Sequence, residues 1–148
     1  MDQAAMGAAI TYGIDHGGWC PPGRTCENGN IREHFNLMET PVERSPHARH
    51  IPRSQRTEWN VRDAEGTLIM ITEHCPTDSG TQWTIEVAEK LKKPWLRVDP
   101  TKSGSVERVD QWIKKNGISL LNVAGPSEAN CTGIGSLTSD FFQRLFSQ

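Results

Sequence analysis

The sequence has neither a long apolar run nor a large excess of charge of either sign. No apolar stretch approaches the roughly 18 residues that a membrane-spanning helix needs, and no basic segment followed by an apolar one marks a signal peptide at the N-terminus. Lys and Arg number 16 against 18 Asp and Glu, for a net charge of -2, whereas general nucleic-acid binders are usually basic. We therefore expect a cytoplasmic protein with neither nucleic acid nor membrane among its partners.

Short motifs of familiar catalytic and redox sites are missing too. The chain has no Gly-x-Ser-x-Gly, no Gly-x-x-x-x-Gly-Lys phosphate loop and no Cys-x-x-Cys. Because no export signal is visible, we expect reduced thiols at the four cysteines, which are Cys20, Cys26, Cys75 and Cys131. His16 and His34 lie near the first two, but the spacing is irregular for a metal site, so we expect buried or half-buried side chains and no metal.

Helical and extended patterns alternate along most of the chain. Its 148 residues suit a single domain, and 35% hydrophobic residues suffice for a core. Alternation of this kind predicts an α/β fold, with a parallel sheet covered by helices on both faces. The expected helices are Asp2–Tyr12, Ser54–Ala64, Thr81–Lys92, one around residues 106–113 that ends at Gly117, and one around residues 137–146; the expected strands are Ile14–Trp19, Thr67–Ile71, Pro94–Val98 and Ile118–Val123.

The loop after the expected strand Thr67–Ile71 is the first candidate for a binding site. Ligands of open α/β sheets bind at the carboxyl ends of the strands. Asp78, Ser79 and Thr81 can each cap the following helix, and Gly80 lets a ligand approach the backbone closely. Free N–H groups and the helix dipole favour an anion there, although an ordinary capped helix without a ligand also explains this pattern.

Two other segments offer polar or aromatic groups. Residues 20–52 form a long irregular stretch, a kind of segment that is often functional, and the segment before and into it contains Gly17, Gly18, Trp19 and Arg24. These residues predict either a pocket wall, with an indole to stack on a ring and a guanidinium to pair with an anion, or a tight structural turn. The local basic cluster within residues 44–56 predicts an anion site, a subunit contact or a solvated loop.

A polar helix face and one further loop complete the candidate residues. Arg56, Asn60 and Asp63 follow each other at i, i+4 and i+7, so they share one face of the helix. That face can present hydrogen bonds to a ligand or to a neighbouring loop. Gly125 begins the loop after the last expected strand, at the same edge of the sheet.

These segments together resemble the family of molybdenum-cofactor carrier proteins, which is related to the lysine decarboxylase-like phosphoribohydrolases. The resemblance implies a Rossmann-like three-layer sandwich, a homo-oligomer, and binding of a phosphorylated or oxyanionic ligand, with molybdenum cofactor (a molybdopterin) as the candidate. It runs along nearly the whole chain. The matching pieces include Asp2-Gln3-Ala4-Ala5, Gly17-Gly18-Trp19-Cys20-Pro21, Glu27-Asn28-Gly29, Trp59-Asn60-Val61-Arg62-Asp63, Asp78-Ser79-Gly80-Thr81 and Asn122-Val123-Ala124-Gly125-Pro126.

The resemblance leaves three functions open. A carrier needs no general base, which suits the absence of a catalytic motif. The related phosphoribohydrolases imply a hydrolase of nucleotide monophosphates with Glu86 and Arg56 as its catalytic residues, but Gln82 and Trp83 stand where those enzymes place a glutamate. A nucleotide-sensing module is the third possibility, and genomic neighbourhood would separate it from the others.

The chain also departs from the family at its N-terminus. The resemblance implies a strand and a glycine-rich loop before Asp2-Gln3-Ala4, and neither is present in this sequence. We expect residues 1–148 to be a single Rossmann-like domain whose sheet lacks its first strand, with an open edge and poor stability or altered association. A stable monomer with a complete sheet would contradict this expectation.

Overall fold

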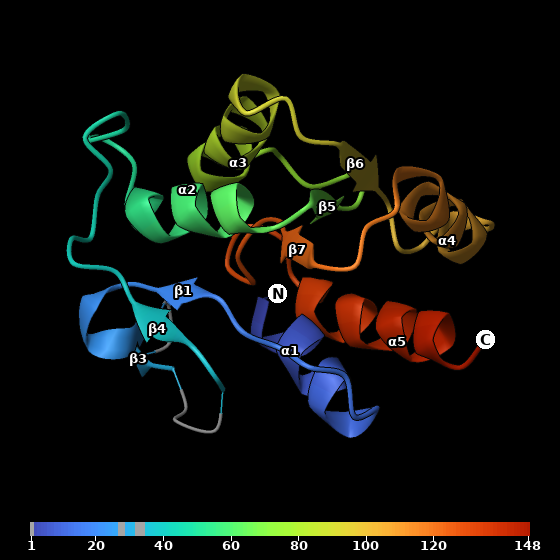
Figure 1. Ribbon diagram of the computed structural model, residues 1–148. Helices are drawn as coiled ribbons and strands as arrows, with labels where there is room; N and C mark the ends of the chain where they lie inside the picture. Colours follow the sequence, from blue (N-terminus) through green and yellow to red (C-terminus); the bar gives the residue numbers. More distant parts are fainter. Residues whose placement is uncertain (1, 27–28, 32–34) are drawn as a thin grey trace.

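A computed structural model describes residues 2–26, 29–31 and 35–148 (Figure 1). His34, Glu27 and Asn28, which the sequence analysis named, lie outside the described residues. The elements in chain order are α1 (Asp2–Thr11), β1 (Trp19–Cys20), a 3₁₀ helix (Pro22–Arg24), β2 (Thr25–Cys26), β3 (Gly29–Asn30), β4 (Met38–Glu39), α2 (Ser54–Asp63), β5 (Gly66–Met70), α3 (Ser79–Lys90), β6 (Trp95–Val98), α4 (Ser105–Asn116), β7 (Leu121–Ala124) and α5 (Ile134–Phe146).

The main sheet is parallel, in the strand order β6-β5-β7. Leu68 at the middle of β5 aligns with Leu96 of β6 on one side and with Val123 of β7 on the other. Helices α3 and α4 make the two crossovers that parallel strands require. The predicted parallel α/β architecture is therefore confirmed.

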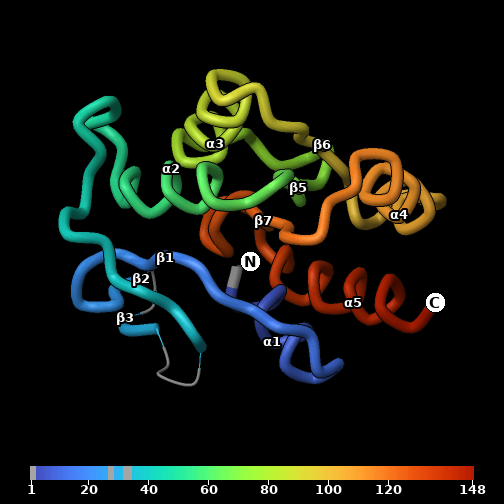
Figure 2. Tube along the Cα trace, in the orientation of Figure 1, coloured from blue at the N-terminus to red at the C-terminus, as the bar shows by residue number. Residues whose placement is uncertain are grey.

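Strand β5 shows why the sheet needs a helical layer on each face. Leu68 and Met70 pack into a cluster with residues of α4 and α5, whereas Ile69 and Ile71 pack with Ile85 of α3. Successive side chains of a strand point to opposite faces, so an uninterrupted apolar strand is buried on both. Figures 1 and 2 show α2 and α3 on one side of the sheet and α1 and α5 on the other, which confirms the three-layer sandwich.

The alanine-rich face of α1 packs against this core. Ala5 and Ala8 contact the cluster that α4 and α5 form with the sheet. Near the end of the helix, the rings of Tyr12 and Phe146 lie 5.7 Å apart. Because these side chains are small, α1 can approach α5 closely.

Several element boundaries differ from the prediction by one or a few residues, and three of them show how the local contacts set the end of an element. The first short strand is only Trp19–Cys20, which pairs in parallel with Met38–Glu39. Helix α3 begins at Ser79 because Asp78 is its N-cap. Strand β7 begins at Leu121, and Ile118, which was predicted to open it, instead packs against Gly66 and leaves no room for a side chain there.

The expectation of four reduced cysteines is wrong for two of them. Cys75 and Cys131 form a disulfide with their Cα atoms 5.4 Å apart, whereas Cys20 and Cys26 are free. The pair is separated by 56 residues, and the pairing of β5 with β7 brings the two loops that follow these strands together. Among the described residues, no group of three or more His, Cys, Asp and Glu side chains could hold a metal ion. The described helices include none that is both long enough and apolar enough to span a membrane.

Candidate functional site

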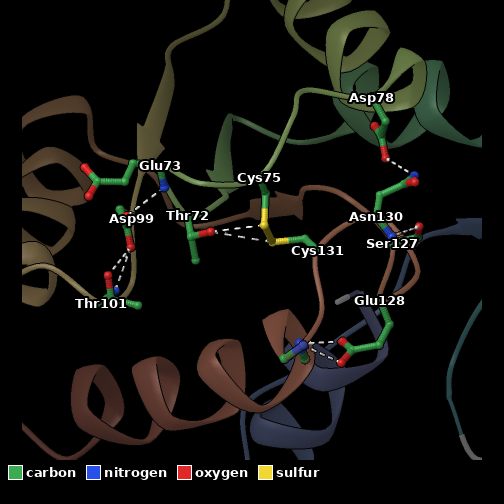
Figure 3. The surroundings of a disulfide bond; sticks show 12 residues. Thr72, Glu73, Cys75, Asp78, Asp99, Thr101, Ser127, Glu128, Asn130 and Cys131 are labelled. Carbon is green, nitrogen blue, oxygen red and sulfur yellow. Dashed lines mark hydrogen bonds between the residues drawn. A yellow bond between two sulfur atoms is a disulfide. The ribbon is translucent and has the colours of Figure 1, made fainter.

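The carboxyl edge of the main sheet carries two connected loops. Residues 71–78 follow β5 and residues 125–133 follow β7, and the disulfide joins them (Figure 3). The Asp78 carboxylate accepts hydrogen bonds from Thr81 N, at 2.8 Å, and from Asn130 Nδ2, at 3.2 Å. Asp78 therefore caps α3 and also anchors the second loop beside it.

The first turn of α3 retains free donors on its other side. The N–H groups of Ser79 and Gly80 have no acceptor within the part of the chain that the structure describes, as is usual for the first residues of a helix. Thr81 is 2% exposed, and its hydroxyl has no hydrogen-bond partner there. Asp78 therefore satisfies the N–H group of Thr81 and leaves those of Ser79 and Gly80 open.

A cavity of about 180 Å³ opens at this side of α3. The loop before α2 contributes His47, Ala48, His50 and Ile51, and α3 contributes Ser79, Gln82, Trp83 and Glu86. The sequence pointed to Ser79 and Glu86 separately, and the fold brings them to one cavity. His47 and His50 belong to the basic cluster of residues 44–56, for which an anion site was one of three predicted roles. Gln82 was not a predicted site residue, although the spacing of residues 79, 82 and 86 on one helical face was a usable signal for it.

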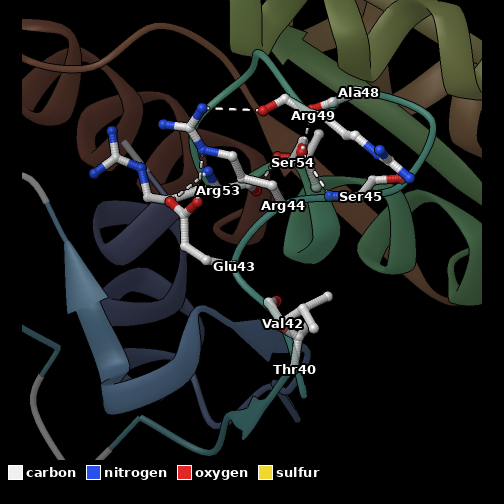
Figure 4. Close-up of polar contacts among 10 residues, drawn as sticks. Thr40, Val42, Glu43, Arg44, Ser45, Ala48, Arg49, Arg53 and Ser54 are labelled. Carbon is white, nitrogen blue, oxygen red and sulfur yellow. Dashed lines mark hydrogen bonds and ion pairs between the residues drawn. The ribbon is translucent and has the colours of Figure 1, made fainter.

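The basic segment is an ordered loop that packs on α3. Its backbone is held by polar side chains, with Ser54 Oγ bridging Ser45 N and the carbonyl oxygen of Ala48 at 2.8 Å each (Figure 4). Arg44 pairs with Glu43 and donates to the carbonyl oxygen of Arg49. Ala48 is buried against Trp83 and Val61. The segment is thus a wall of the cavity rather than a fully solvated loop.

The loop after β7 is fixed by Glu128. Its carboxylate accepts hydrogen bonds from the N–H groups of Gly135, at 3.1 Å, and Gly133, at 2.6 Å, at the start of α5. These bonds lower the pKa of Glu128. Gly125 begins this loop directly after β7, so it lies at the predicted edge of the sheet.

The polar face of α2 holds the Trp19 loop. Asn60 accepts from Trp19 N at 2.8 Å and donates to the Trp19 carbonyl oxygen at 3.1 Å, and Asp63 accepts from Trp19 Nε1 at 2.7 Å. A hydrogen bond from Arg62 is the largest contribution to the lowered pKa of Asp63. Of the two roles predicted for this face, the structure shows binding of a neighbouring loop.

The glycines before Trp19 fit the same contact. Gly18 has a φ of +133°, and a Cβ there would lie 2.9 Å from the Asn60 Oδ1 atom. Only glycine therefore allows the close approach of this loop to α2. At Gly17, an added Cβ would lie 3.6 Å from the carbonyl oxygen of Asn36, so this glycine also lies in contact with a neighbouring segment.

The two predicted arginines lie on the Trp19 side of α2. Arg24 donates to the carbonyl oxygens of Ile31, Phe35 and Leu37, and so stabilises its own loop. Burial raises the pKa of the Cys20 thiol, and the positive charges of Arg24 and Arg56 partly offset the increase. Neither arginine is among the residues that line the cavity.

The predicted site residues therefore fall into two groups, one at α3 and the edge of the sheet, the other where α2 meets the Trp19 loop. Helix α2 packs on α3 and also contacts β1. Ser79, Gly80, Thr81 and Glu86 belong to α3, with Gly125 at the same edge of the sheet. The other group, around Trp19, consists of Gly17, Gly18, Trp19, Arg24, Arg56, Asn60 and Asp63.

Comparison with known proteins agrees with this architecture. The model of the circularly permutated YpsA SLOG family matches residues 1–146. The chain belongs to this family. A solved structure titled "Putative molybdenum carrier protein", from Syntrophus aciditrophicus, superposes on this member of the SLOG family with a TM-score of 0.86 at 32% identity. The match covers 99% of this chain and 88% of that chain. No curated protein matches. The family resemblance that the motifs predicted is confirmed.

Proposed function

We propose that this protein binds a small phosphorylated or oxyanionic ligand at the first turn of α3. The observation that carries the proposal is the pair of free N–H groups at Ser79 and Gly80 beside a cavity that Ser79 lines. Helix N-termini attract anions through such donors and through the helix dipole. The negative charge of the Asp78 carboxylate, which caps the same helix, weakens this attraction.

The size of the cavity limits which part of a ligand enters it. At about 180 Å³ it is smaller than the roughly 300–1,000 Å³ of pockets that enclose drug-sized molecules. It suits a tetrahedral oxyanion such as phosphate or molybdate, or the phosphate end of a larger molecule. Molybdenum cofactor, a molybdopterin with a phosphate group, is the first candidate because the solved relative is titled a molybdenum carrier.

Differential scanning fluorimetry with molybdate, tungstate, phosphate, AMP and molybdopterin tests the proposal. A true ligand at about 100 times its Kd stabilises the folded protein by about 2.7 kcal/mol, which raises its melting temperature measurably. No shift with any of these compounds, in a folded sample, would refute anion binding.

The variant Ser79→Pro locates the site. Ser79 is the first residue of α3 and follows an extended Asp78, so proline is tolerated there while its N–H is lost. We expect the ligand-induced shift to fall sharply while the unliganded melting temperature stays near that of the wild type. Ser136→Ala, in the exposed part of the first turn of α5, is the control and should keep the full shift.

A hydrolase of nucleotide monophosphates is the second candidate. The observation in its favour is that Glu86 lines the same cavity as Ser79 and His47, so a carboxylate and an imidazole lie near the proposed phosphate position. Water would cleave the N-glycosidic bond. Its hydroxyl group adds to C1′ of the ribose and its proton goes to the base, which gives a free base and ribose 5-phosphate. Chromatographic detection of free base from AMP tests it.

Two variants give that assay its controls. Glu86→Gln should abolish the release of base, whereas Glu89→Gln, on an exposed part of the same helix, should not. Arg56→Ala, which the phosphoribohydrolase resemblance also implies to be inactive, lies outside the cavity lining. Inactivity of the wild type across a panel of nucleotide monophosphates would refute this candidate.

A further inference from the structure

The disulfide lies at the junction of the two loops that flank the first turn of α3. Cys75 precedes Asp78 by three residues, and Cys131 directly follows Asn130. Asn130 in turn donates to the Asp78 carboxylate that caps α3 (Figure 3). The covalent bond and the Asn130–Asp78 hydrogen bond thus tie the same two loops together at neighbouring points.

We propose that Cys75 and Cys131 form a reversible redox site that exchanges with small thiols and disulfides, and that its state controls ligand binding at α3. The other two cysteines, Cys20 and Cys26, differ from this pair because both are free thiols. The coupling to binding rests on the proposed function, whereas the thiol–disulfide exchange is independent of it.

The two sulfur atoms differ in access, which gives the reaction a direction. Cys75 is half-buried, whereas Cys131 is 2% exposed. Thiol–disulfide exchange proceeds by attack of a thiolate on one sulfur of the bond, so we expect attack on Cys75 Sγ. Cys131 then leaves as the thiolate.

The exchange balances with a low-molecular-weight thiol such as glutathione. The first thiolate forms a mixed disulfide with Cys75 while the S–S bond to Cys131 breaks, and Cys131 takes up a proton. A second thiolate attacks the small-molecule sulfur of the mixed disulfide and releases Cys75, which is protonated in turn. Two small thiols thus become one small disulfide, two protein thiols form, and the reverse reaction with oxidised glutathione restores the bond.

Thr72 is placed to assist the leaving sulfur. Its hydroxyl donates to Cys75 Sγ at 3.1 Å and lies 3.7 Å from Cys131 Sγ. A hydroxyl donor stabilises a nearby thiolate, and a better stabilised leaving thiolate departs faster. Because a hydroxyl hydrogen rotates about its C–O bond, the same hydroxyl can donate to Cys131 Sγ without movement of its oxygen.

Opening the bond should loosen the cap of α3. In the reduced protein only non-covalent contacts, among them the Asn130–Asp78 bond, hold the loops together at this edge. Because that bond is exposed, its net contribution is small. Asp78 then gains freedom to move beside the Ser79 and Gly80 donors, where its negative charge opposes a bound anion.

Peptide mass spectrometry after alkylation tests the exchange. The folded protein is equilibrated with glutathione mixtures of increasing reduced fraction, quenched in acid and digested. We expect a linked Cys75–Cys131 peptide that disappears as reduced glutathione rises and returns on reoxidation. Absence of the linked peptide at every ratio would overturn the site, and so would a link that opens only after unfolding in urea.

Two threonine variants test the role of Thr72 in the exchange. Thr72→Val should slow reduction about fivefold, the equivalent of one net hydrogen bond. Thr77→Val, in the same loop but with its hydroxyl near Arg97, should reduce at the wild-type rate. Equal rates for wild type and Thr72→Val would overturn this assignment.

Molybdate and AMP titrations test the coupling to binding. Oxidised protein should bind whichever anion it recognises about tenfold more tightly than reduced protein or Cys131→Ala, a difference within the usual range of coupling between sites. Equal affinities would overturn the coupling alone. No binding in either state would overturn the proposed function and the coupling with it, whereas the mass spectrometry decides the exchange in every case.

Discussion

Residues 54–146 and the described residues between 13 and 53 differ in what holds their backbones in place. In the first region, three parallel strands and their helices bury continuous apolar side chains, with Leu68, Ile69 and Met70 fully buried. In the second, strands of two residues each are connected by loops. Side chains bind the backbone there, as Arg24 does at three carbonyl oxygens.

The comparison shows where each region can carry function. A sheet stabilised by apolar burial tolerates polar loops at its carboxyl edge, and the candidate site at α3 lies there. The irregular region contributes a wall to the cavity through His47 and His50. Removing a contact should therefore have different effects in the two regions: a loss of global stability in the sheet, and local loosening in the irregular region.

The largest effect is expected at the centre of the sheet. Leu68→Ala removes a fully buried side chain of β5 and should lower the free energy of unfolding by about 4 kcal/mol, since it leaves a cavity between the sheet and the helices α4 and α5. Urea unfolding followed by circular dichroism measures it. Leu120→Ala, at a leucine that is 55% exposed, should change stability little; equal losses in the two variants would contradict a core centred on β5.

The second effect distinguishes the stability that the disulfide contributes from the stability that burial of a sulfur atom contributes. Cys131→Ala and Cys20→Ala each remove a buried sulfur, but only the first breaks a crosslink that closes a long loop. We expect Cys131→Ala to be about 3 kcal/mol less stable than Cys20→Ala in oxidising buffer. Thermal unfolding with and without reductant measures this, and a difference that survives full reduction would be inconsistent with the crosslink.

The third effect belongs to the irregular region. Asn60→Ala removes both bonds to the Trp19 backbone and should cost about 1–2 kcal/mol. Faster amide exchange and proteolysis should be confined to residues near Trp19, with β5 unchanged. Asn116→Ala, which loses one exposed bond at the end of α4, is the control; faster exchange throughout β5 would show that the two regions unfold together.

The smallest effect concerns pH. The lowered pKa of Glu128 means that its bonds to Gly135 and Gly133 add stability above the unfolded value of about 4.3, and this stability is lost as pH falls through the folded pKa. Glu128→Gln should therefore be less stable at pH 7, by less than about 1 kcal/mol because the site is exposed, and the deficit should vanish in acid. Melting curves of wild type and variant from pH 7 to pH 3 measure it, with Glu89→Gln as the control. A deficit independent of pH would contradict this role.

Much of the regular region was predictable because its signals are local. The apolar run around Leu68 indicates a strand buried on both faces, and Gly117 ends α4 in the left-handed conformation that favours glycine. Asp78, the N-cap of α3, was one of three residues that the sequence offered as the cap. The choice among them depends on the length of the preceding loop, which local pattern does not determine.

The irregular region and the site were predictable only in part. Arg56, Asn60 and Asp63 were expected to share a helical face, but spacing could not say that Asn60 and Asp63 bind Trp19 rather than a ligand. Similarly, nothing near His47 in the sequence points to Glu86. Such pairs are decided by which elements pack together, and propensity and periodicity carry no information about that.

By itself the sequence determined the order of helices and strands, the parallel sheet and the family resemblance. These depend on apolar periodicity and on short motifs, whose residues are near each other in the sequence. Only the tertiary structure decided that Cys75 meets Cys131 and that the loop around His47 closes a cavity on α3. The physical reason is that the disulfide depends on β5 lying beside β7, and the cavity depends on the loop before α2 packing against α3. These contacts bring together loops that are far apart in the sequence, and only then can a disulfide form or a cavity close between them.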